Sequence, residues 1–279
     1  MSEFLLEEER WPAELAQPQR ERLRDIVSGL RGVPEVLGIA AGGSFVSGRM
    51  DEYSDLDLLV VVAEPAVPEI RRRREEIASG LGPLLAAFTG EHVGEPRLLI
   101  CLYGPPPVHV DLKFVTPGEL SARVEDPVVL WDREGEVRRG LDLGVGSYPG
   151  PDWQWIEDRF WVWAHYAASK IGRGELFEAL GFIGFLRGRV LGPILLAETS
   201  ARPDGVRRIE QAAPELARRL EETVARYDAR DILRASRAAI AMYRFLRESS
   251  APRGLVRRDE AEAAADRYLE AVASRLGGA

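Results

Sequence analysis

The chain has 279 residues, of which 46% are hydrophobic and 29% charged, and its formal net charge is −8. This length suits one or two globular domains. Acidic and basic residues are interspersed, which argues against a broad nucleic-acid-binding surface, since such a surface needs a basic excess. A single cysteine, Cys101, excludes internal disulfides and thiolate metal clusters.

The apolar segments are too short to predict a membrane helix. The longest unbroken apolar run covers residues 58–63, whereas a membrane span needs roughly 18 residues. The acidic start MSEFLLEEER also lacks the basic and apolar regions of a secretory signal. We therefore expect a cytoplasmic protein with no membrane partner.

The first half of the chain alternates helical and strand patterns. Helices are expected at residues 19–30 and 67–86, a short helix opens at Ser44, and strands are expected at 36–41, 56–62, 97–103 and 108–115. Gly42-Gly43 and the Gly-Pro-Pro-Pro run at 104–107 supply turns. This alternation predicts an α/β domain.

The second half lacks strand signals and has helical patterns. Asp152 can cap a helix over residues 153–171, in which apolar residues recur every three or four positions. Further helices are expected at 175–198, where Gly-Pro at 192–193 should interrupt the helix, and at 205–226, 229–248 and 258–275. We therefore predict an α+β protein of two domains: residues 1–145, with a mixed sheet, and residues 146–279, an all-helical bundle.

The segment from Gly42 to Asp57 has the strongest chemical pattern. The two glycines after a strand permit a tight turn and close approach to a ligand. Ser44 then opens a helix whose unpaired N–H groups and dipole attract phosphate. After ten intervening residues, Asp55 and Asp57 lie two apart on a strand, so both carboxylates project from one face.

Two neighbouring carboxylates repel each other and need a compensating charge at neutral pH. Magnesium suits such a site when it also receives triphosphate oxygens. The later strand at 108–115 alternates strictly, so His109, Asp111 and Lys113 share one face. If that strand lies beside the first, Asp111 completes a site of three carboxylates and two metal ions. Lys113 then lies near incoming phosphates, and His109 lies at the rim.

Each part of this pattern alone has an ordinary structural explanation. An Asp-x-Asp at a strand start is usually a solvated edge, a polar strand face is usually the wet side of a sheet, and Gly-Gly-Ser is usually a turn. Their combined order and spacing favour the catalytic interpretation. Arg49 suits a phosphate contact or the surface equally, and Lys170 suits a triphosphate contact or solvent.

The residues Gly42-Gly43-Ser44, Asp55-Leu56-Asp57 and Asp111 resemble the signature of the DNA polymerase β-like nucleotidyltransferase superfamily. Residues 43–57 are similar to its small-molecule branch, which includes aminoglycoside and lincosamide nucleotidyltransferases. The resemblance implies a two-layer catalytic domain, two Mg²⁺ ions, ATP or another NTP as donor, and often a homodimer. By motif position Ser44 contacts the triphosphate, while Asp55, Asp57 and Asp111 hold metal.

We therefore expect transfer of a nucleoside monophosphate, AMP first, to a hydroxyl of a small acceptor, with release of pyrophosphate. The helical domain is expected to serve substrate binding or dimerisation. The expected nucleotide-binding residues are Gly43, Ser44, Arg49, Lys113 and Lys170.

The identity of the general base and the class of acceptor stay open. Asp111 is our first choice of general base, with Glu157 and Glu175 as alternatives. In some relatives the base lies one turn before a lysine, but the residue in that place before Lys170 is Tyr166. AMP transfer to a protein or an RNA end, and a non-catalytic antitoxin-like module of the same fold, are the alternative functions.

Overall fold

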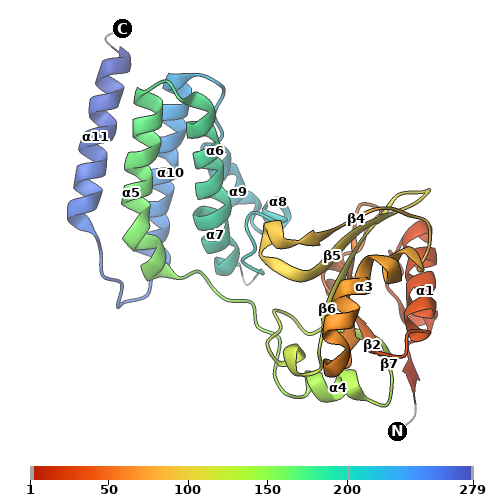
Figure 1. Cartoon of the computed structure of the whole chain (residues 1–279). Coiled ribbons are helices and arrows are strands. Elements are labelled where there is room, and N and C mark those ends of the chain that lie inside the picture. Colours follow the sequence, from red (N-terminus) through yellow and green to blue (C-terminus); the bar gives the residue numbers. More distant parts are fainter. Residues whose placement is uncertain (1–2, 200, 278–279) are drawn as a thin grey trace. The chain divides into compact units, whose positions relative to one another are not determined.

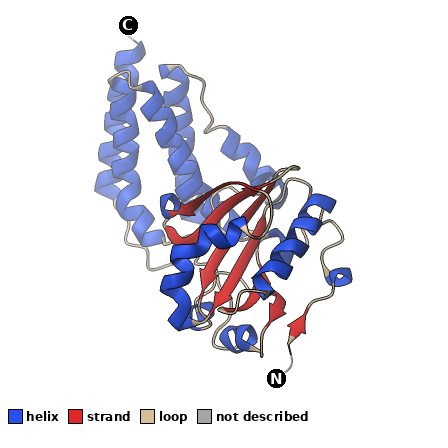
Figure 2. Ribbon diagram, turned by 45° about the vertical axis from the view of Figure 1, so that its right-hand side comes forward, coloured by secondary structure: helices blue, strands red, loops and turns tan. Residues whose placement is uncertain are grey.

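The computed structural model describes residues 3–199 and 201–277. The chain forms two compact units, Met1–Ser147 and Tyr148–Ala279. The first unit contains a sheet with helices packed on it, and the second is built from helices (Figures 1 and 2). The prediction of an α+β protein with a helical C-terminal part is confirmed.

The sheet of the first unit has seven strands in the order β1-β7-β2-β3-β6-β5-β4. The strands are β1 (Phe4–Leu5), β2 (Val36–Ala41), β3 (Leu56–Val62), β4 (Leu84–Gly90), β5 (Glu95–Tyr103), β6 (Val108–Val115) and β7 (Val128–Asp132). β3 pairs with β6 in parallel, whereas the other pairings are antiparallel. The sheet is therefore mixed, as predicted.

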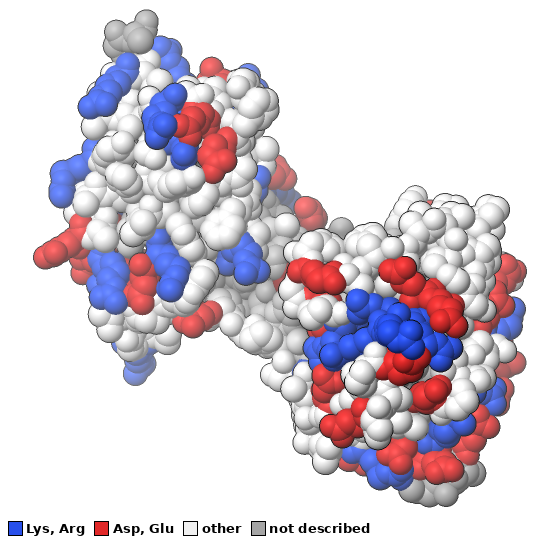
Figure 3. All heavy atoms as spheres, viewed as in Figure 1, with Lys and Arg blue, Asp and Glu red and all other residues white. Residues whose placement is uncertain are grey.

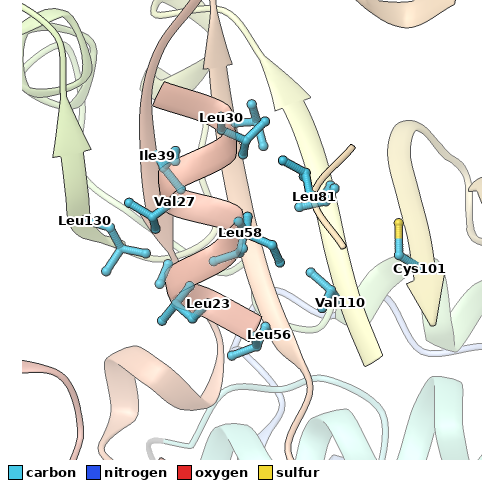
Figure 4. Packing of buried hydrophobic residues seen from close by; sticks show 14 of the residues in the cluster. Leu23, Val27, Leu30, Ile39, Leu56, Leu58, Leu81, Cys101, Val110 and Leu130 are labelled. Atoms are coloured by element: carbon cyan, nitrogen blue, oxygen red, sulfur yellow. The ribbon is translucent and has the colours of Figure 1, made fainter. Parts of the chain in front are cut away.

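The longer helices α1 and α3 of the first unit cover one face of this sheet. The helices of the first unit are α1 (Gln17–Arg31), α2 (Ser44–Ser47), α3 (Val67–Ser79) and α4 (Glu136–Leu141), and its 3-10 turns are Glu8–Arg10, Glu64–Ala66, Glu91–Val93 and Gly118–Ser121. α1 and α3 bury their apolar sides in one core with the sheet, where Leu23 of α1 lies close to Leu58 of β3 (Figure 4). That core is the main apolar layer of the unit.

The opposite face of β3 changes character along the strand. Side chains of a strand alternate between faces, so Asp57 and Val61 point away from α1 and α3. Val61 packs with Val137 of α4 and Leu120 in a small second cluster. Asp57, at the start of the strand, is only partly buried. This face is therefore apolar at one end and polar where β3 begins.

The expected helix over residues 67–86 is wrong in its second part. α3 ends at Ser79, and Leu84–Gly90 forms β4 instead. Gly82 has a φ of +148° and Pro83 follows it, so the helix cannot continue. β4 then pairs with β5 in an antiparallel hairpin.

Four arginines at residues 71–74 give α3 a basic outer surface (Figure 3). The side chains of Arg72 and Arg73 form ion pairs with Glu69 and Glu76 on the same helix. Such exposed pairs offset part of the positive charge and contribute little to stability, because water and salt screen them. The block is a solvated helix surface.

The second unit consists of helices of very different lengths. They are α5 (Trp153–Gly172), α6 (Leu176–Leu186), the π-helical turn Arg187–Leu191, α7 (Gly192–Glu198), α8 (Ile209–Ala212), α9 (Pro214–Glu221), α10 (Ala229–Ser250) and α11 (Asp259–Gly277). The predicted cap of α5 is present, since the Trp155 amide donates to Asp152 Oδ1 at 2.9 Å. The expected interruption near residues 192–193 takes the form of the π-helical turn.

The expected single helix over residues 205–226 is wrong. The segment forms the short helices α8 and α9, with Arg208 at a φ of +55° before the first and Pro214 opening the second. Proline lacks an amide hydrogen and suits the first turn of a helix, not its interior. The chain therefore restarts the helix at Pro214.

One helical segment among the described residues, Leu176–Glu198, is long and apolar enough to cross a membrane, with a mean hydropathy of 1.5. Half of it is buried inside the protein. Burial of this kind is typical of the core helix of a bundle, which passes the same test of length and composition. The segment is weak evidence for a membrane span.

Candidate active site

The pairing of β3 with β6 brings the predicted acidic residues together. Asp57 is the direct register partner of Asp111, and Leu56 is the partner of Val110. Asp55 directly precedes β3, and His109 directly precedes Val110 on β6, so continuing the parallel register past Leu56 and Val110 places Asp55 opposite His109. The expectation that these two strands are neighbours is confirmed, and the residues form two rows on one face.

The side chains in these rows converge closely. Asp55, His109 and Asp111 each offer a ligand atom, and these atoms all lie within 4.8 Å of one another. His109 Nε2 is 2.9 Å from Asp111 Oδ1. Two neighbouring ligands at about 2.1 Å from an octahedral metal ion stand about 3 Å apart. The arrangement is therefore close to the spacing that a single divalent ion requires.

Gly43 forms the turn that faces Asp57. Its φ is +59° and its ψ is −132°, a conformation that residues with a side chain rarely adopt. The preceding amide, of Gly42, donates to the carbonyl oxygen of Asp57 at 2.9 Å. A Cβ atom on Gly43 would lie 2.0 Å from Asp57 Oδ2. The glycine therefore makes room for the carboxylate itself.

Ser44 begins helix α2, as predicted, but α2 has only four residues. Few peptide dipoles add up over one turn, so the expected attraction of phosphate by the helix dipole is small. The Ser44 hydroxyl donates to Met50 Sδ at 2.8 Å. Contact of Ser44 with a triphosphate stays a prediction, and it requires this hydroxyl to rotate.

Glu125 is a residue of this site that the sequence did not predict. Its Oε1 accepts a hydrogen bond of 2.7 Å from the amide of Gly43. The glycine turn was expected to approach a ligand phosphate. Its Gly43 amide instead donates to the Glu125 carboxylate. Glu125 lies in the loop before β7, outside any periodic pattern.

Arg123 fixes the conformation of the Glu125 loop. Its guanidinium donates to the carbonyl oxygens of Leu120 and Leu141 at 2.9 Å and to that of Gly144 at 2.6 Å. Arg123 also pairs with Asp126. Arg123 is mostly buried in the structure, but an arginine near glycines has no special meaning in the sequence. The sequence therefore held no signal for Glu125.

Lys113 lies on the same face of β6 as Asp111, and its ammonium is 2.7 Å from Glu95 Oε2. Arg97 donates to both carboxylate oxygens of Glu95. This hydrogen bonding is the largest influence that lowers the pKa of Glu95 to about 2. Lys113 must leave this pair to reach a phosphate. Its predicted phosphate contact stays a prediction.

The remaining predicted residues are Arg49, which lies between α2 and Asp55, and Lys170. Arg49 is exposed just after α2, and its amide donates to the Ser44 carbonyl at 3.2 Å. Lys170 belongs to the second unit, where it is 2.6 Å from Glu175 Oε2 and lies over the Tyr166 ring. Nucleotide contacts of Arg49 and Lys170 stay predictions, and Glu175, held by Lys170, is already engaged as an ion-pair partner.

Glu157, an alternative general base, is fully buried in the second unit. Its carboxylate accepts hydrogen bonds from Trp161, Tyr243, Arg247 and the amide of Arg258. An acceptor hydroxyl cannot reach a carboxylate enclosed in this way. Glu157 therefore has a structural role in holding α5, α10 and the start of α11 together.

The donor set of the strand site suits a divalent metal ion. Carboxylate oxygens favour hard cations such as Mg²⁺ and Mn²⁺, and one imidazole nitrogen is compatible with Mn²⁺ and later transition metals. Asp57 and Asp111 on paired strands, with Asp55 directly before β3, are the residues that would hold such an ion beside the Gly43 turn. The donor atoms of the described residues therefore fit a divalent metal ion, which nucleotidyl transfer needs.

A model of the nucleotidyltransferase domain family matches residues 20–87, from α1 through the glycine turn and the first two aspartates into β4. The first unit contains a nucleotidyltransferase domain. The reaction of such a domain is nucleotidyl transfer, in agreement with the arrangement of Asp55 and Asp57. Asp111 and Glu125 lie beyond the matched residues; the β3–β6 pairing brings Asp111 beside Asp57, and the loop before β7 brings Glu125 to Gly43.

Two solved structures match most of the chain at low identity and low TM-score. An aminoglycoside 6-adenyltransferase from Bacillus subtilis is 12% identical, covers 89% of this chain and 96% of its own, and has a TM-score of 0.40. A nucleotidyltransferase-like protein from Exiguobacterium sibiricum is 14% identical, covers 81% and 74% respectively, and has a TM-score of 0.38. No curated protein matches the chain.

Proposed function

We propose that the protein transfers a nucleoside monophosphate, AMP first, from a nucleoside triphosphate to a hydroxyl of a small polyhydroxylated molecule, and releases pyrophosphate. An aminoglycoside or a lincosamide is the kind of acceptor that we expect, in the cytoplasm. The observation that carries the proposal is the parallel register of Asp57 with Asp111, beside the Gly43 turn.

Divalent ions bound at such a site neutralise charge on the phosphates and orient the attacking and leaving oxygens. The chain's own residues supply the positioning. Asp57 and Asp111 stand on two hydrogen-bonded strands, and Asp55 directly precedes the first of them, so the backbone positions of the three carboxylates are fixed relative to one another. The Gly43 turn brings its backbone against Asp57, and a phosphate reaches the Gly43 amide when it displaces Glu125.

The acceptor oxygen attacks the α-phosphorus in line with the bond to pyrophosphate. The new oxygen–phosphorus bond forms as the bond to pyrophosphate breaks, and the acceptor proton passes to a carboxylate oxygen of Asp111. Asp111 is the proposed base because it lies on the same face as the proposed metal ligands. Glu157 is enclosed and cannot replace it.

We assign acceptor binding or dimerisation to the second unit. That unit contains a cavity of about 200 Å³, whose lining includes Tyr148, Trp155, Asp152 and Asp204. Aromatic faces and carboxylates together suit a polar, hydroxyl-bearing or cationic molecule. The cavity supports the choice of a small acceptor over a protein or RNA.

Incubation with labelled ATP, Mg²⁺ and a panel of aminoglycosides, lincosamides, proteins and RNA tests the proposal. Labelled small molecule supports it, label on protein or RNA alone overturns the acceptor class, and absence of nucleotide binding overturns the activity.

Asp57→Asn should abolish transfer with unchanged thermal unfolding. Asp142→Asn, an exposed aspartate at the end of α4, is the control that should keep activity. Retained transfer in Asp57→Asn refutes the metal assignment.

A further inference from the structure

His109 has a position that the pattern of carboxylates alone does not explain. It has a ligand atom within 4.8 Å of one of Asp55, which directly precedes β3, and its Nε2 is 2.9 Å from Asp111 Oδ1 on its own strand. Half of the His109 side chain is exposed. The imidazole is therefore flanked by two carboxylates at the open end of the polar face.

β5, the strand on the other side of β6 from β3, offers no further metal ligand beside His109. On β5 the register partner of His109 is Leu102, and that of Asp111 is Ile100. Both side chains are apolar. Side chains on paired strands interact mainly with their direct partners, so the ligand atoms of His109 and Asp111 converge toward Asp55 on the β3 side.

We propose that His109 is a nitrogen ligand of the metal site and that this site therefore prefers Mn²⁺ to Mg²⁺. The inference rests on the proposed function, which supplies the metal requirement. The ligand atoms of Asp55, His109 and Asp111 lie within 4.8 Å of one another, and ligands on opposite sides of an ion are about 4.2 Å apart. A small side-chain adjustment completes the site.

The choice of metal follows from the chemistry of the donors. Mg²⁺ prefers oxygen ligands and dehydrates reluctantly, whereas imidazole suits transition metals, whose affinities rise from Mn²⁺ toward Cu²⁺. Ligation through Nε2 places the imidazole proton on Nδ1. A site of carboxylates alone would discriminate less between Mg²⁺ and Mn²⁺ than a site with one imidazole.

The test measures metal binding directly, on the full chain without nucleotide or acceptor. Mn²⁺ and Mg²⁺ affinities are measured by calorimetry, and pulsed electron paramagnetic resonance of bound Mn²⁺ detects a directly coordinated ¹⁴N nucleus. We expect Mn²⁺ to bind about tenfold more tightly than Mg²⁺ and the ¹⁴N signal to be present.

His109→Asn and His92→Asn form a matched pair of variants. His92 is exposed in the 3-10 turn after β4, where its ring lies against Phe88. We expect His109→Asn to lose the ¹⁴N signal and most of the Mn²⁺ preference while its Mg²⁺ affinity changes less than about twofold. His92→Asn should behave as the wild type. Circular dichroism checks that both variants are folded.

The outcomes separate this inference from the proposed function. A wild-type protein that binds no Mn²⁺, or binds it without a ¹⁴N signal, overturns the inference, as does a signal that survives in His109→Asn. If transfer depends on Asp57 but bound Mn²⁺ shows no nitrogen ligand, the proposed function stands and the inference about His109 fails. A nitrogen ligand in a protein that transfers nothing overturns only the proposed function.

Discussion

The carboxylate of Asp57 lies where any side chain on residue 43 would have to go. A Cβ atom on Gly43 would stand 2.0 Å from Asp57 Oδ2, far inside van der Waals contact. The backbone at Gly43 also has a φ of +59°, so a side chain there is strained even without the contact. The turn and the proposed metal ligand are therefore a single structural unit.

Replacement of Gly43 by alanine should abolish transfer. The methyl group displaces Asp57, and a displacement of about 1 Å in a catalytic group can lower a rate about 100-fold. Steady-state kinetics and metal titration check this. Gly48→Ala is the control, since Gly48 has a φ of +62° and a Cβ atom on it would meet no atom within 4 Å. It should cost about 1 kcal/mol of stability and keep activity. Equal activity in the two variants would contradict the role of the contact.

The hydrogen bond from Gly43 to Glu125 leads to a second prediction. A nucleotide phosphate that takes the Gly43 amide must displace the Glu125 carboxylate, and hydrogen bonds to charged groups contribute about 1.5–3 kcal/mol. We therefore expect Glu125→Ala to bind nucleotide about tenfold more tightly. Titration with a fluorescent ATP analogue measures it.

Glu64→Ala is the control for loss of one negative charge, because Glu64 is exposed in a 3-10 turn at the far end of β3. It should leave nucleotide affinity unchanged. Weaker binding in Glu125→Ala would show that Glu125 supports the nucleotide instead of competing with it.

The central strands were predictable because their signals are local. The strands at 36–41, 56–62 and 108–115 were predicted with the bounds that the structure has, since each is a continuous or alternating apolar run. β4 was not, because its sequence LLAAFTG is rich in helix-forming residues and becomes a strand only by pairing with β5.

The site was predictable to the extent that it follows strand alternation. Asp55, Asp57 and Asp111 were identified from their spacing and from one assumption of adjacency, which the β3–β6 pairing satisfies. Glu125 was not, because contacts of Arg123 with residues 120, 141 and 144 place its loop. His109 was predicted at the rim, and its side chain is half exposed, but its closeness to Asp55 and Asp111 depends on side-chain directions that the alternation alone does not give.

A third prediction concerns acid stability of the first unit. Arg97 and then Lys113 lower the pKa of Glu95 from 4.5 to about 2. A carboxyl group whose pKa is lower in the folded state stabilises the fold above its unfolded pKa, and this contribution is lost as pH falls. The loss should therefore occur between 4.5 and about 2.

Urea unfolding of wild type and Glu95→Gln at about pH 5 and about pH 3 measures this contribution. The variant should be less stable than the wild type at the higher pH, and the difference should shrink at the lower pH. Glu64→Gln, at an exposed carboxylate, should show no such change. A difference that is the same at both pH values would exclude the ionised Glu95 as its cause.

The buried carboxylate of Glu157 leads to the last prediction, which separates structure from catalysis. Burial tends to raise its pKa, but hydrogen bonds from Tyr243, the Arg258 amide and Trp161 outweigh burial and lower it. Glu157 and Arg247 are a buried ion pair, with side chains 0% and 3% exposed. Removing one member of such a pair costs about 3–5 kcal/mol.

Glu157→Gln should therefore lower the unfolding free energy of the second unit by about 3 kcal/mol. Tryptophan fluorescence follows this unfolding, because four of the six tryptophans lie in the second unit, among them Trp161, which donates to Glu157. Glu215→Gln is the control, because Glu215 pairs with Arg218 at the surface, where a pair contributes about 0–1 kcal/mol. Below its unfolding transition, Glu157→Gln should keep its turnover number. A large fall in turnover without loss of stability would restore Glu157 as a candidate base and would weigh against Asp111.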